Sequence, residues 1–248
     1  MPPAEADLRA ALAGSFGAAS ALYERARPGY PEAALDWLLP AGSPRILDLG
    51  AGTGKLTRQI AGRGLEVVAV DPSAGMLAQL REVLPGVEAH QGTAEQIPLP
   101  DGAVDAVLVA QAWHWVDVPA ASREVARVLA AGGHLGLVWN KRDERVPWVA
   151  ELGRITDFSV PTMDASAPLV GPPFGELEEF QTEWSVPMSP ASLVDLVGSR
   201  SAVIIASEAE RDARIERIRR LLASDPELRG RDTFELPYVT LCYRARLR

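Results

Sequence analysis

The sequence predicts an α/β protein with a doubly wound, mostly parallel sheet, and three observations support this class. Short apolar runs alternate with stretches of helical spacing as far as residue 140. A glycine-rich turn connects the first of these runs to a helix. Beyond residue 140 two further strand-like runs enclose helical patterns, which predicts an antiparallel closing strand with a small helical lid inserted near the C-terminus.

The period of the apolar positions predicts each element of the first part in turn. Parallel strands are expected over Arg45 to Leu49, Glu66 to Val70, Val87 to His90, Val104 to Val109 and His134 to Trp139. Helices are expected between them over Thr53 to Ala61, Ser73 to Val83 and Val118 to Leu129. Strands in a row joined by helical crossovers make a doubly wound fold.

The second part of the chain predicts the closing strands and the lid. A helix from Val146 to about Phe158 precedes a loop rich in Pro and Gly, from Pro161 to Gly175. Strands are expected over Glu178 to Val186 and Thr233 to Ala245, with helices between them over Ala191 to Val197 and Ser207 to Leu222. We expect a single domain over residues 1–248, with a loose N-terminus over 1–20 and the lid over about 187–230.

Composition and charge limit the class of function. Hydrophobic residues make up 47% and charged residues 23% of the 248 residues, the balance of an ordinary folded protein. A net charge of −8 opposes binding to a phosphate backbone, so a small-molecule substrate is favoured over a nucleic acid. Without a basic leader or a long apolar run, the expected location is the cytoplasm and no membrane contact is expected. The single cysteine, Cys242, is expected to be a buried strand residue.

The strongest motif is Ile46-Leu-Asp-Leu-Gly-Ala-Gly-Thr-Gly-Lys, a buried strand that runs into glycines at 50, 52 and 54. Glycines let the backbone turn sharply and let a ligand touch the main chain. A dinucleotide fingerprint needs its third glycine where Lys55 stands. A phosphate loop needs glycine at position 49 and serine or threonine at position 56, and both are leucine. What remains is an acidic residue followed by Gly-x-Gly-x-Gly.

With this motif the sequence resembles the class I methyltransferases that use S-adenosylmethionine on a Rossmann-like sheet, and among them the type 11 methyltransferases. The resemblance implies that the loop of Gly50, Ala51, Gly52 and Gly54 passes beneath the methionine part of the cofactor. It also implies that Asp48 helps to organise the amino group of the cofactor. An acid suits this ligand, which has an ammonium and a sulfonium but no phosphate.

A second element is Val67-Val-Ala-Val-Asp-Pro-Ser, in which a strand ends in an acid about twenty residues after the first glycine, where such folds place the partner of the ribose. Asp71 is thus the expected acceptor for both ribose hydroxyls. Met76 in the following helix is expected to pack on the adenine. Pro72 and Gln111 complete this part of the predicted cofactor site.

A third element, Gln91-Gly-Thr-Ala-Glu-Gln-Ile-Pro, resembles the family's segment between the third and fourth strands. Many members have Asp at the position of Thr93, so this chain departs from the pattern. We expect Thr93 to accept one hydrogen bond from the adenine and Ala94 to offer its backbone amide. Glu95 is expected to support Thr93 and Ala94 without contacting the adenine itself.

The fourth strand ends in Val109-Ala-Gln-Ala-Trp-His-Trp-Val, at the edge of the sheet where doubly wound folds bind ligands. The His-Trp pair resembles the branch of the family that includes trans-aconitate methyltransferase. His114 and Trp115 are therefore the catalytic candidates, with His114 as a general base or a donor to the substrate, because imidazole titrates near neutral pH. The alternative is that His114 orients the loop while the tryptophans pack.

Further candidates flank this region. Tyr23, Arg27 and Tyr30 lie in a Tyr-x-x-x-Arg-Pro-x-Tyr-Pro pattern that similar methyltransferases have as a cap over the cofactor pocket. A structural role beside the helix that begins at Pro31 is the alternative for this pattern. Asn140 and Arg200 are candidate acceptor contacts. No metal-ligand spacing is found, so no metal is expected.

We therefore predict an enzyme that transfers the methyl group of S-adenosylmethionine to a small molecule and releases S-adenosylhomocysteine. A carboxylate or hydroxyl group is the favoured acceptor, and methylation at nitrogen or carbon stays open. The first alternative is an NAD-dependent oxidoreductase, which shares the sheet and Asp71 but needs a glycine at Lys55. The second is a non-catalytic cofactor-binding protein, in which Trp113 or Trp115 fills the acceptor pocket.

Overall fold

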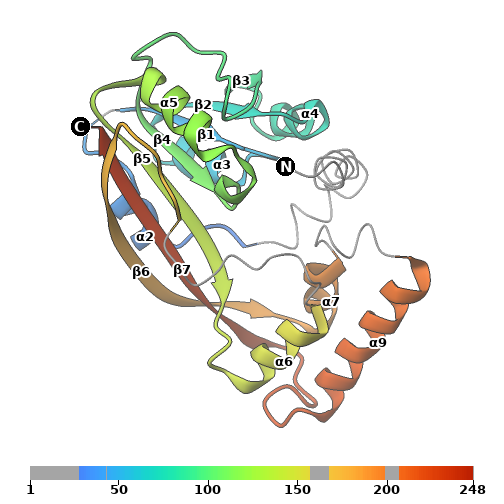
Figure 1. The fold of residues 1–248 in the computed structure, drawn as a ribbon. Helices are drawn as coiled ribbons and strands as arrows, with labels where there is room; N and C mark the ends of the chain where they lie inside the picture. Colours follow the sequence, from blue (N-terminus) through green and yellow to red (C-terminus); the bar gives the residue numbers. More distant parts are fainter. Residues whose placement is uncertain (1–27, 43, 157–167, 199–206, 248) are drawn as a thin grey trace. The chain divides into compact units, whose positions relative to one another are not determined.

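The computed structural model describes residues 28–42, 44–156, 168–198 and 207–247. A seven-stranded sheet has the strand order β3-β2-β1-β4-β5-β7-β6 (Figure 1). Its strands are β1 (Arg45–Leu49), β2 (Glu66–Asp71), β3 (Glu88–Gln91), β4 (Val104–Ala110), β5 (Leu129–Arg142), β6 (Phe174–Met188) and β7 (Phe234–Leu247). The first five strands of this order, β3, β2, β1, β4 and β5, pair in parallel, and the closing strands are antiparallel. The predicted fold class is confirmed.

Helices connect the strands, and local signals explain where several of them begin. They are α2 (Glu32–Leu38), α3 (Lys55–Gly62), α4 (Ala74–Val83), α5 (Val118–Val128), α6 (Pro147–Thr156), α7 (Pro190–Gly198), α9 (Glu208–Ser224) and the 3-10 helix η1 (Trp113–Trp115). The side chains of Ser73 and Asp117 accept main-chain hydrogen bonds at the start of α4 and α5. Ser207 and Glu210 form a capping box on α9.

The described residues fall into two compact units. The sheet unit consists of residues 29–140, 168–182 and 240–247, apart from residue 43. The helical unit consists of residue 28 with residues 141–156, 183–198 and 207–239. Strands β5, β6 and β7 contribute residues to both units.

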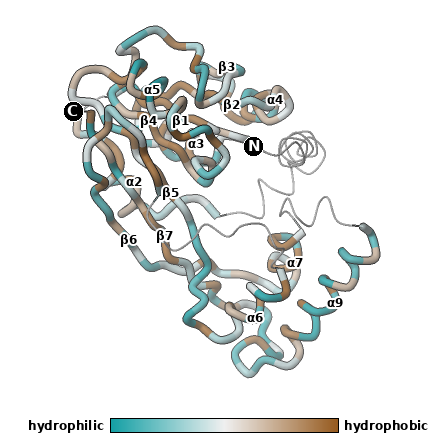
Figure 2. Tube along the Cα trace, viewed as in Figure 1, coloured by the Kyte–Doolittle hydropathy of each residue, from teal (hydrophilic) through white to brown (hydrophobic). Residues whose placement is uncertain are grey.

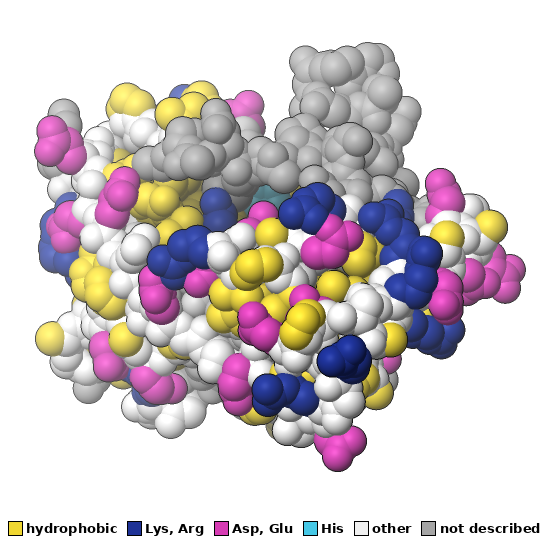
Figure 3. Space-filling view, turned by 90° about the horizontal axis from the view of Figure 1, so that it is seen from below, with side chains coloured by type: hydrophobic (Ala, Val, Ile, Leu, Met, Phe, Trp, Pro, Cys, Tyr) yellow, Lys and Arg dark blue, Asp and Glu magenta, His cyan; other side chains and the backbone are white. Residues whose placement is uncertain are grey.

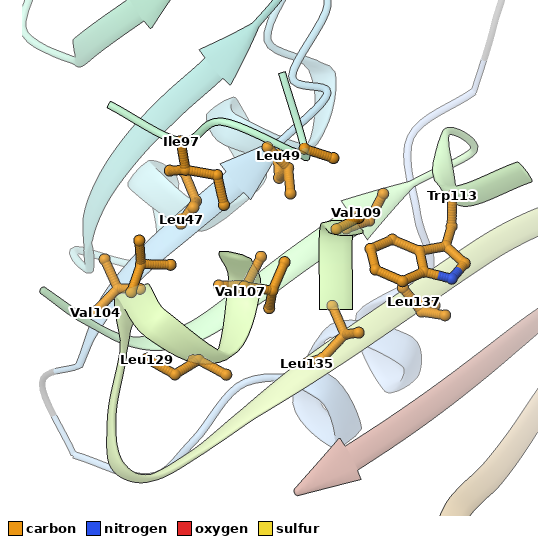
Figure 4. Close-up of a cluster of buried hydrophobic side chains, with 14 of the residues drawn as sticks. Leu47, Leu49, Ile97, Val104, Val107, Val109, Trp113, Leu129, Leu135 and Leu137 are labelled. Carbon is orange, nitrogen blue, oxygen red and sulfur yellow. The ribbon is translucent and has the colours of Figure 1, made fainter. Parts of the chain in front are cut away.

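Apolar side chains cover both faces of the sheet in the sheet unit, because successive strand residues point to opposite sides. On one face Leu47, Val107 and Leu135 pack in a cluster that includes residues of α5 (Figure 4). On the other face Ile46 and Leu108 pack in a cluster with residues of α2 and α3. Helices on both faces are what the doubly wound prediction requires.

Cys242 lies in β7 and is fully buried in the second of these clusters, as the sequence predicted. Burial raises the pKa of its thiol to about 12. The thiolate is the reactive form of cysteine, so this side chain serves packing and not chemistry.

The helical unit has an apolar core of its own. Residues of α6, α7 and α9 pack there with the strand ends, and the ring of Trp148 meets Phe234 edge-on at 5.6 Å. Figure 2 shows α9 as mainly hydrophilic along its length, and its buried residues are Ile218 and Leu221. The helices predicted over 191–197 and 207–222 correspond to α7 and α9.

Element bounds differ most from the prediction at the long strands. β5 begins at Leu129 and not at His134, because Ala130 to Gly133 offer no alternation of apolar and polar residues to signal a strand. β6 begins at Phe174, within the predicted loop, most of whose remaining residues lie outside the described part. The helix η1 was not predicted.

Acidic and basic side chains are interspersed on the molecular face in Figure 3. Independently of that view, exposed ion pairs join Arg63 with Asp36 and Arg127 with Asp101. Among the described residues, no helix has both the length and the hydropathy that crossing a bilayer requires.

Candidate functional site

The glycine loop between β1 and α3 is a tight turn in left-handed backbone conformations. The φ angles of Gly50, Gly52 and Gly54 are 77°, 56° and 90°. Residues with a Cβ atom rarely adopt these angles, which explains why glycine occupies the three positions. Gly50 N donates to Val70 O at 2.8 Å and so ties the loop to β2. A Cβ atom on residue 50 would lie 2.9 Å from the Cβ of Ala112, so the loop also closely approaches the turn after β4.

Asp48 lies directly before this loop and is completely buried. Thr57 Oγ1 on α3 donates to its Oδ2 at 2.6 Å, whereas Oδ1 has no hydrogen-bond partner. Burial raises the pKa of Asp48 to about 7; the bond from Thr57 opposes this rise and the charge of Asp71 adds to it. A buried acceptor without a donor is costly. The cationic amino group of a ligand beside Oδ1 would satisfy it and favour the ionised carboxylate.

Asp71 ends β2 and is oriented by main-chain amides. Gly52 N donates to Oδ2 and Ser73 N donates to Oδ1, both at 2.8 Å. Burial raises the pKa of Asp71, and these two bonds oppose the rise. Each carboxylate oxygen has a further lone pair. The carboxylate is therefore held in a fixed direction and can still accept from a pair of hydroxyl groups.

The predicted adenine-side residues lie on α4 and on the turn after β3. Met76 and Ala94 are buried and Thr93 is exposed. The main chains of Thr93 and Gln96 exchange hydrogen bonds at 3.2 Å. Glu95 Oε1 accepts from Asp117 N at 2.8 Å and thus supports the start of α5. Adenine contact by this set stays a prediction, and the same holds for Pro72, whose carbonyl accepts from Gln91 Nε2 at 3.0 Å.

The turn after β4 is strained and leads into η1. Among the described residues, Gln111 is the one non-glycine residue with a positive φ, 59°. Trp113 is buried beside Val109 and Leu137 (Figure 4), and its Nε1 donates to Leu169 O at 2.8 Å. Trp113 thereby anchors η1, while His114 and Trp115 are exposed with their rings 4.7 Å apart. The two catalytic candidates thus share the turn that faces the glycine loop.

The remaining candidates are placed as follows. The ring of Tyr30 is buried in the core cluster formed with α2 and α3. Asn140 Nδ2 donates to Gly29 O at 2.8 Å, and Thr240 Oγ1 donates to Asn140 Oδ1 at 2.7 Å. Tyr23, Arg27 and Arg200 lie outside the described residues. In the described part of the chain, no cluster of three or more His, Cys, Asp or Glu side chains could hold a metal ion.

Sequence reasoning missed three polar side chains that support the site, Thr57, Gln59 and Thr240. Thr57 and Gln59 lie on the helix that follows the glycine loop, and a hydroxyl on the buried face of that helix was the available signal for Thr57. No local pattern could reveal Thr240, because its partner Asn140 is 100 residues away in the chain.

Known proteins with similar sequences decide the family. Residues 47–137 match the family described as Methyltransferase domain. An uncharacterized methyltransferase of Mycobacterium tuberculosis is 54% identical over 234 residues, which cover 94% of this chain and 96% of the relative. The chain belongs to the class I methyltransferase family. The family resemblance seen in the sequence is thereby confirmed, whereas the trans-aconitate branch stays a prediction.

More distant proteins agree with this assignment of the methyltransferase. An uncharacterized methyltransferase-like protein of Schizosaccharomyces pombe is 35% identical over 232 residues, 89% of this chain and 91% of the relative. A solved structure from Anaeromyxobacter dehalogenans, provisionally named a type II methyltransferase, has a TM-score of 0.60 and 25% identity. It covers 90% of this chain and 97% of its own. The methyltransferase therefore matches both proteins over most of their length and shares the fold of the solved structure.

Proposed function

We propose that this methyltransferase uses S-adenosylmethionine to methylate a small molecule at a carboxylate or hydroxyl group. The observation that carries the proposal concerns Asp48, which directly precedes the glycine loop. Its buried Oδ1 has no hydrogen-bond partner. Asp71 lies close enough to raise the pKa of Asp48. Asp48, directly before the glycine loop, suits a ligand with a positive charge and opposes the pyrophosphate of a dinucleotide. Asp71 suits the ribose of either cofactor.

The residues present fit this cofactor. When bound, S-adenosylmethionine supplies a methyl group on a positively charged sulfonium. The main chain of Gly50 to Gly54 would lie beneath its methionine part, and Asp48 would accept from its ammonium. Asp71 would accept from the ribose hydroxyls, because its carboxylate is already aligned by Gly52 and Ser73. Met76 would pack on the adenine.

The exposed pair His114 and Trp115 is the proposed acceptor side. A hydroxyl acceptor loses a proton when it is methylated, and His114 would take that proton as a general base. A carboxylate acceptor has no proton to lose, so His114 would then only orient it. In both cases most of the acceleration comes from holding the acceptor in line with the methyl group. The resemblance of the His-Trp pair to the trans-aconitate branch favours a carboxylate.

Transfer of a radiolabelled methyl group from S-adenosylmethionine tests this proposal. The protein is incubated with the labelled compound and a cell extract separated into small molecules, proteins and nucleic acids. At a limiting concentration of S-adenosylmethionine we expect label in the small-molecule fraction with the wild type and much less with Asp71→Ala. Label in the protein or nucleic-acid fraction would contradict the small-molecule acceptor, and an equal amount of label with Asp71→Ala and wild type would contradict the assigned cofactor site.

A further inference from the structure

Resting on the function proposed above, we infer that Asn140 is a positioning residue that sets the spacing between the glycine loop and the turn after β4. It does so through a closed series of contacts, called here the contact ring. The ring runs through the loop at Gly50, α3 at Gln59, the segment Gly29-Tyr30, Asn140 on β5, and the turn Gln111-Ala112.

The side chain of Asn140 fixes Gly29 from the side of β5. Its Nδ2 donates to Gly29 O at 2.8 Å, and its Oδ1 accepts from Thr240 Oγ1 at 2.7 Å. Thr240 is completely buried in β7. Because the Thr240 hydroxyl donates to the oxygen of the amide, the nitrogen of the amide is left to face Gly29.

Gln59 holds the same segment from the side of α3. Tyr30 N donates to Gln59 Oε1 at 2.8 Å, and Gln59 Nε2 donates to Tyr30 O at 2.7 Å. A Cβ atom on residue 29 would lie 2.7 Å from Gln59 Oε1, so glycine there permits this close approach. Since α3 begins directly after Gly54, holding the helix also holds the end of the glycine loop.

The main chain of Asn140 closes the other half of the ring. Its carbonyl oxygen accepts from Gln111 Nε2 at 3.2 Å, and Gln111 N donates to Val138 O at 2.9 Å. These bonds hold Gln111 in its positive-φ conformation, which persists only where the surroundings enforce it. Ala112 follows directly and abuts Gly50. Asn140 is therefore connected to the glycine loop in two ways. Its side chain acts through Gly29-Tyr30 and Gln59, and its main chain acts through Gln111 and Ala112.

Through the contact ring, Asn140 affects the affinity of a ligand bound over the glycine loop without contacting that ligand. If Asn140 releases Gly29 or reorients, the loop and the turn are no longer fixed against each other. A ligand must then order both when it binds, and that ordering lowers its affinity. A purely structural hydrogen bond would lower the stability of the protein and leave the affinity unchanged.

Isothermal titration with S-adenosylhomocysteine tests the ring in Asn140→Ala, Thr240→Val and Thr240→Ser. We expect the first two variants to bind about 3- to 30-fold more weakly than wild type, the range for residues that couple to a site without contacting it. Thr240→Ser keeps the hydroxyl donor and should bind like wild type. Hydrogen exchange at the Tyr30 amide, which Gln59 holds, should be faster in the two weak variants.

The control is Asp105→Ala, which removes a side-chain bond to the main chain, from Arg45 N at 2.8 Å, at the other end of β1. It should bind like wild type. Wild-type affinity in Asn140→Ala and Thr240→Val, even with lowered thermal stability, would overturn the inference. If Asn140→Ala does not fold, the Thr240 pair decides alone. A wild-type protein that does not bind S-adenosylhomocysteine would instead overturn the proposed function, and the inference with it.

Discussion

Thr57 donates a hydrogen bond of 2.6 Å to one oxygen of Asp48, while the other oxygen of the same buried carboxyl group has no partner. A half-satisfied buried acid weakens a fold, and such groups with perturbed pKa values gather at functional sites. Asp48 is therefore expected to lower the stability of the ligand-free protein and to strengthen the binding of the ligand.

The first prediction concerns Asp48→Asn, which removes the charge and keeps the shape. Burial raises the pKa of Asp48 from 3.8 to about 7, so the folded state favours the protonated form. That contribution is fully present below pH 3.8 and is lost as the pH rises through about 7. From pH 5 to pH 8 the variant should gain at least about 1.4 kcal/mol of unfolding free energy relative to wild type, equivalent to a tenfold change in proton affinity.

Urea unfolding of both proteins at the two pH values measures this difference. The same variant should bind S-adenosylhomocysteine more weakly, because it no longer offers a carboxylate to the ligand's ammonium. An equal stability difference at both pH values would show that the carboxyl group is not protonated in the folded protein at neutral pH.

The second prediction concerns Asp71→Ala. The variant should lose about 1.5 to 3 kcal/mol of affinity for S-adenosylhomocysteine, the range for hydrogen bonds to a charged group. Asp36→Ala serves as a control, because it removes an exposed carboxylate that pairs with Arg63 in the same unit. Titration calorimetry on both variants decides the matter, and unchanged affinity in Asp71→Ala would refute the ribose assignment.

The third prediction uses the contact between the loop and the turn. Gly50→Ala would place a Cβ 2.9 Å from that of Ala112, at a φ of 77°, so it should abolish measurable binding of S-adenosylhomocysteine. Adding Ala112→Gly removes the clash but not the strain and should restore binding in part. Gly42→Ala has a similar φ of 95° with open space around it and should leave binding intact. No recovery in the double variant would mean that backbone strain alone matters.

The fourth prediction separates catalysis from packing at His114. If His114 is a general base, His114→Ala should lower turnover of a hydroxyl acceptor by at least about 100-fold. Its affinity for S-adenosylhomocysteine should stay at the wild-type value. Once the label-transfer experiment has identified an acceptor, steady-state rates provide the comparison. Normal turnover would assign His114 the loop-orienting role.

The fold was predictable because its signals are local. Short continuous apolar runs between stretches of helical spacing predicted the strands, and the glycines at 50, 52 and 54 predicted the loop whose positive φ angles the structure shows. The additional length of β5 was not predictable, because Ala130 to Gly133 are small residues without a pattern and lie where the register with β4 is irregular.

The site was predictable only in its local part. Asp48 and Asp71 were identified because each stands at a fixed place relative to a strand end. Their supporting partners depend on contacts between distant segments, as Asn140 with Gly29 and Thr240 illustrates. Tyr30 was predicted as part of a cap over the cofactor, with a structural role beside the helix that begins at Pro31 as the alternative. Its burial in the core cluster with α2 and α3 agrees with the alternative, and the cap stays a prediction.

Titration of the wild-type protein with S-adenosylhomocysteine, beside an identical titration with NAD, tests the central claim most directly. The glycine loop, the unpartnered oxygen of Asp48 and the aligned carboxylate of Asp71 predict binding of S-adenosylhomocysteine and no binding of NAD. Binding of NAD alone would contradict the account, because it would mean that Asp48 tolerates a pyrophosphate and that the loop serves a different cofactor.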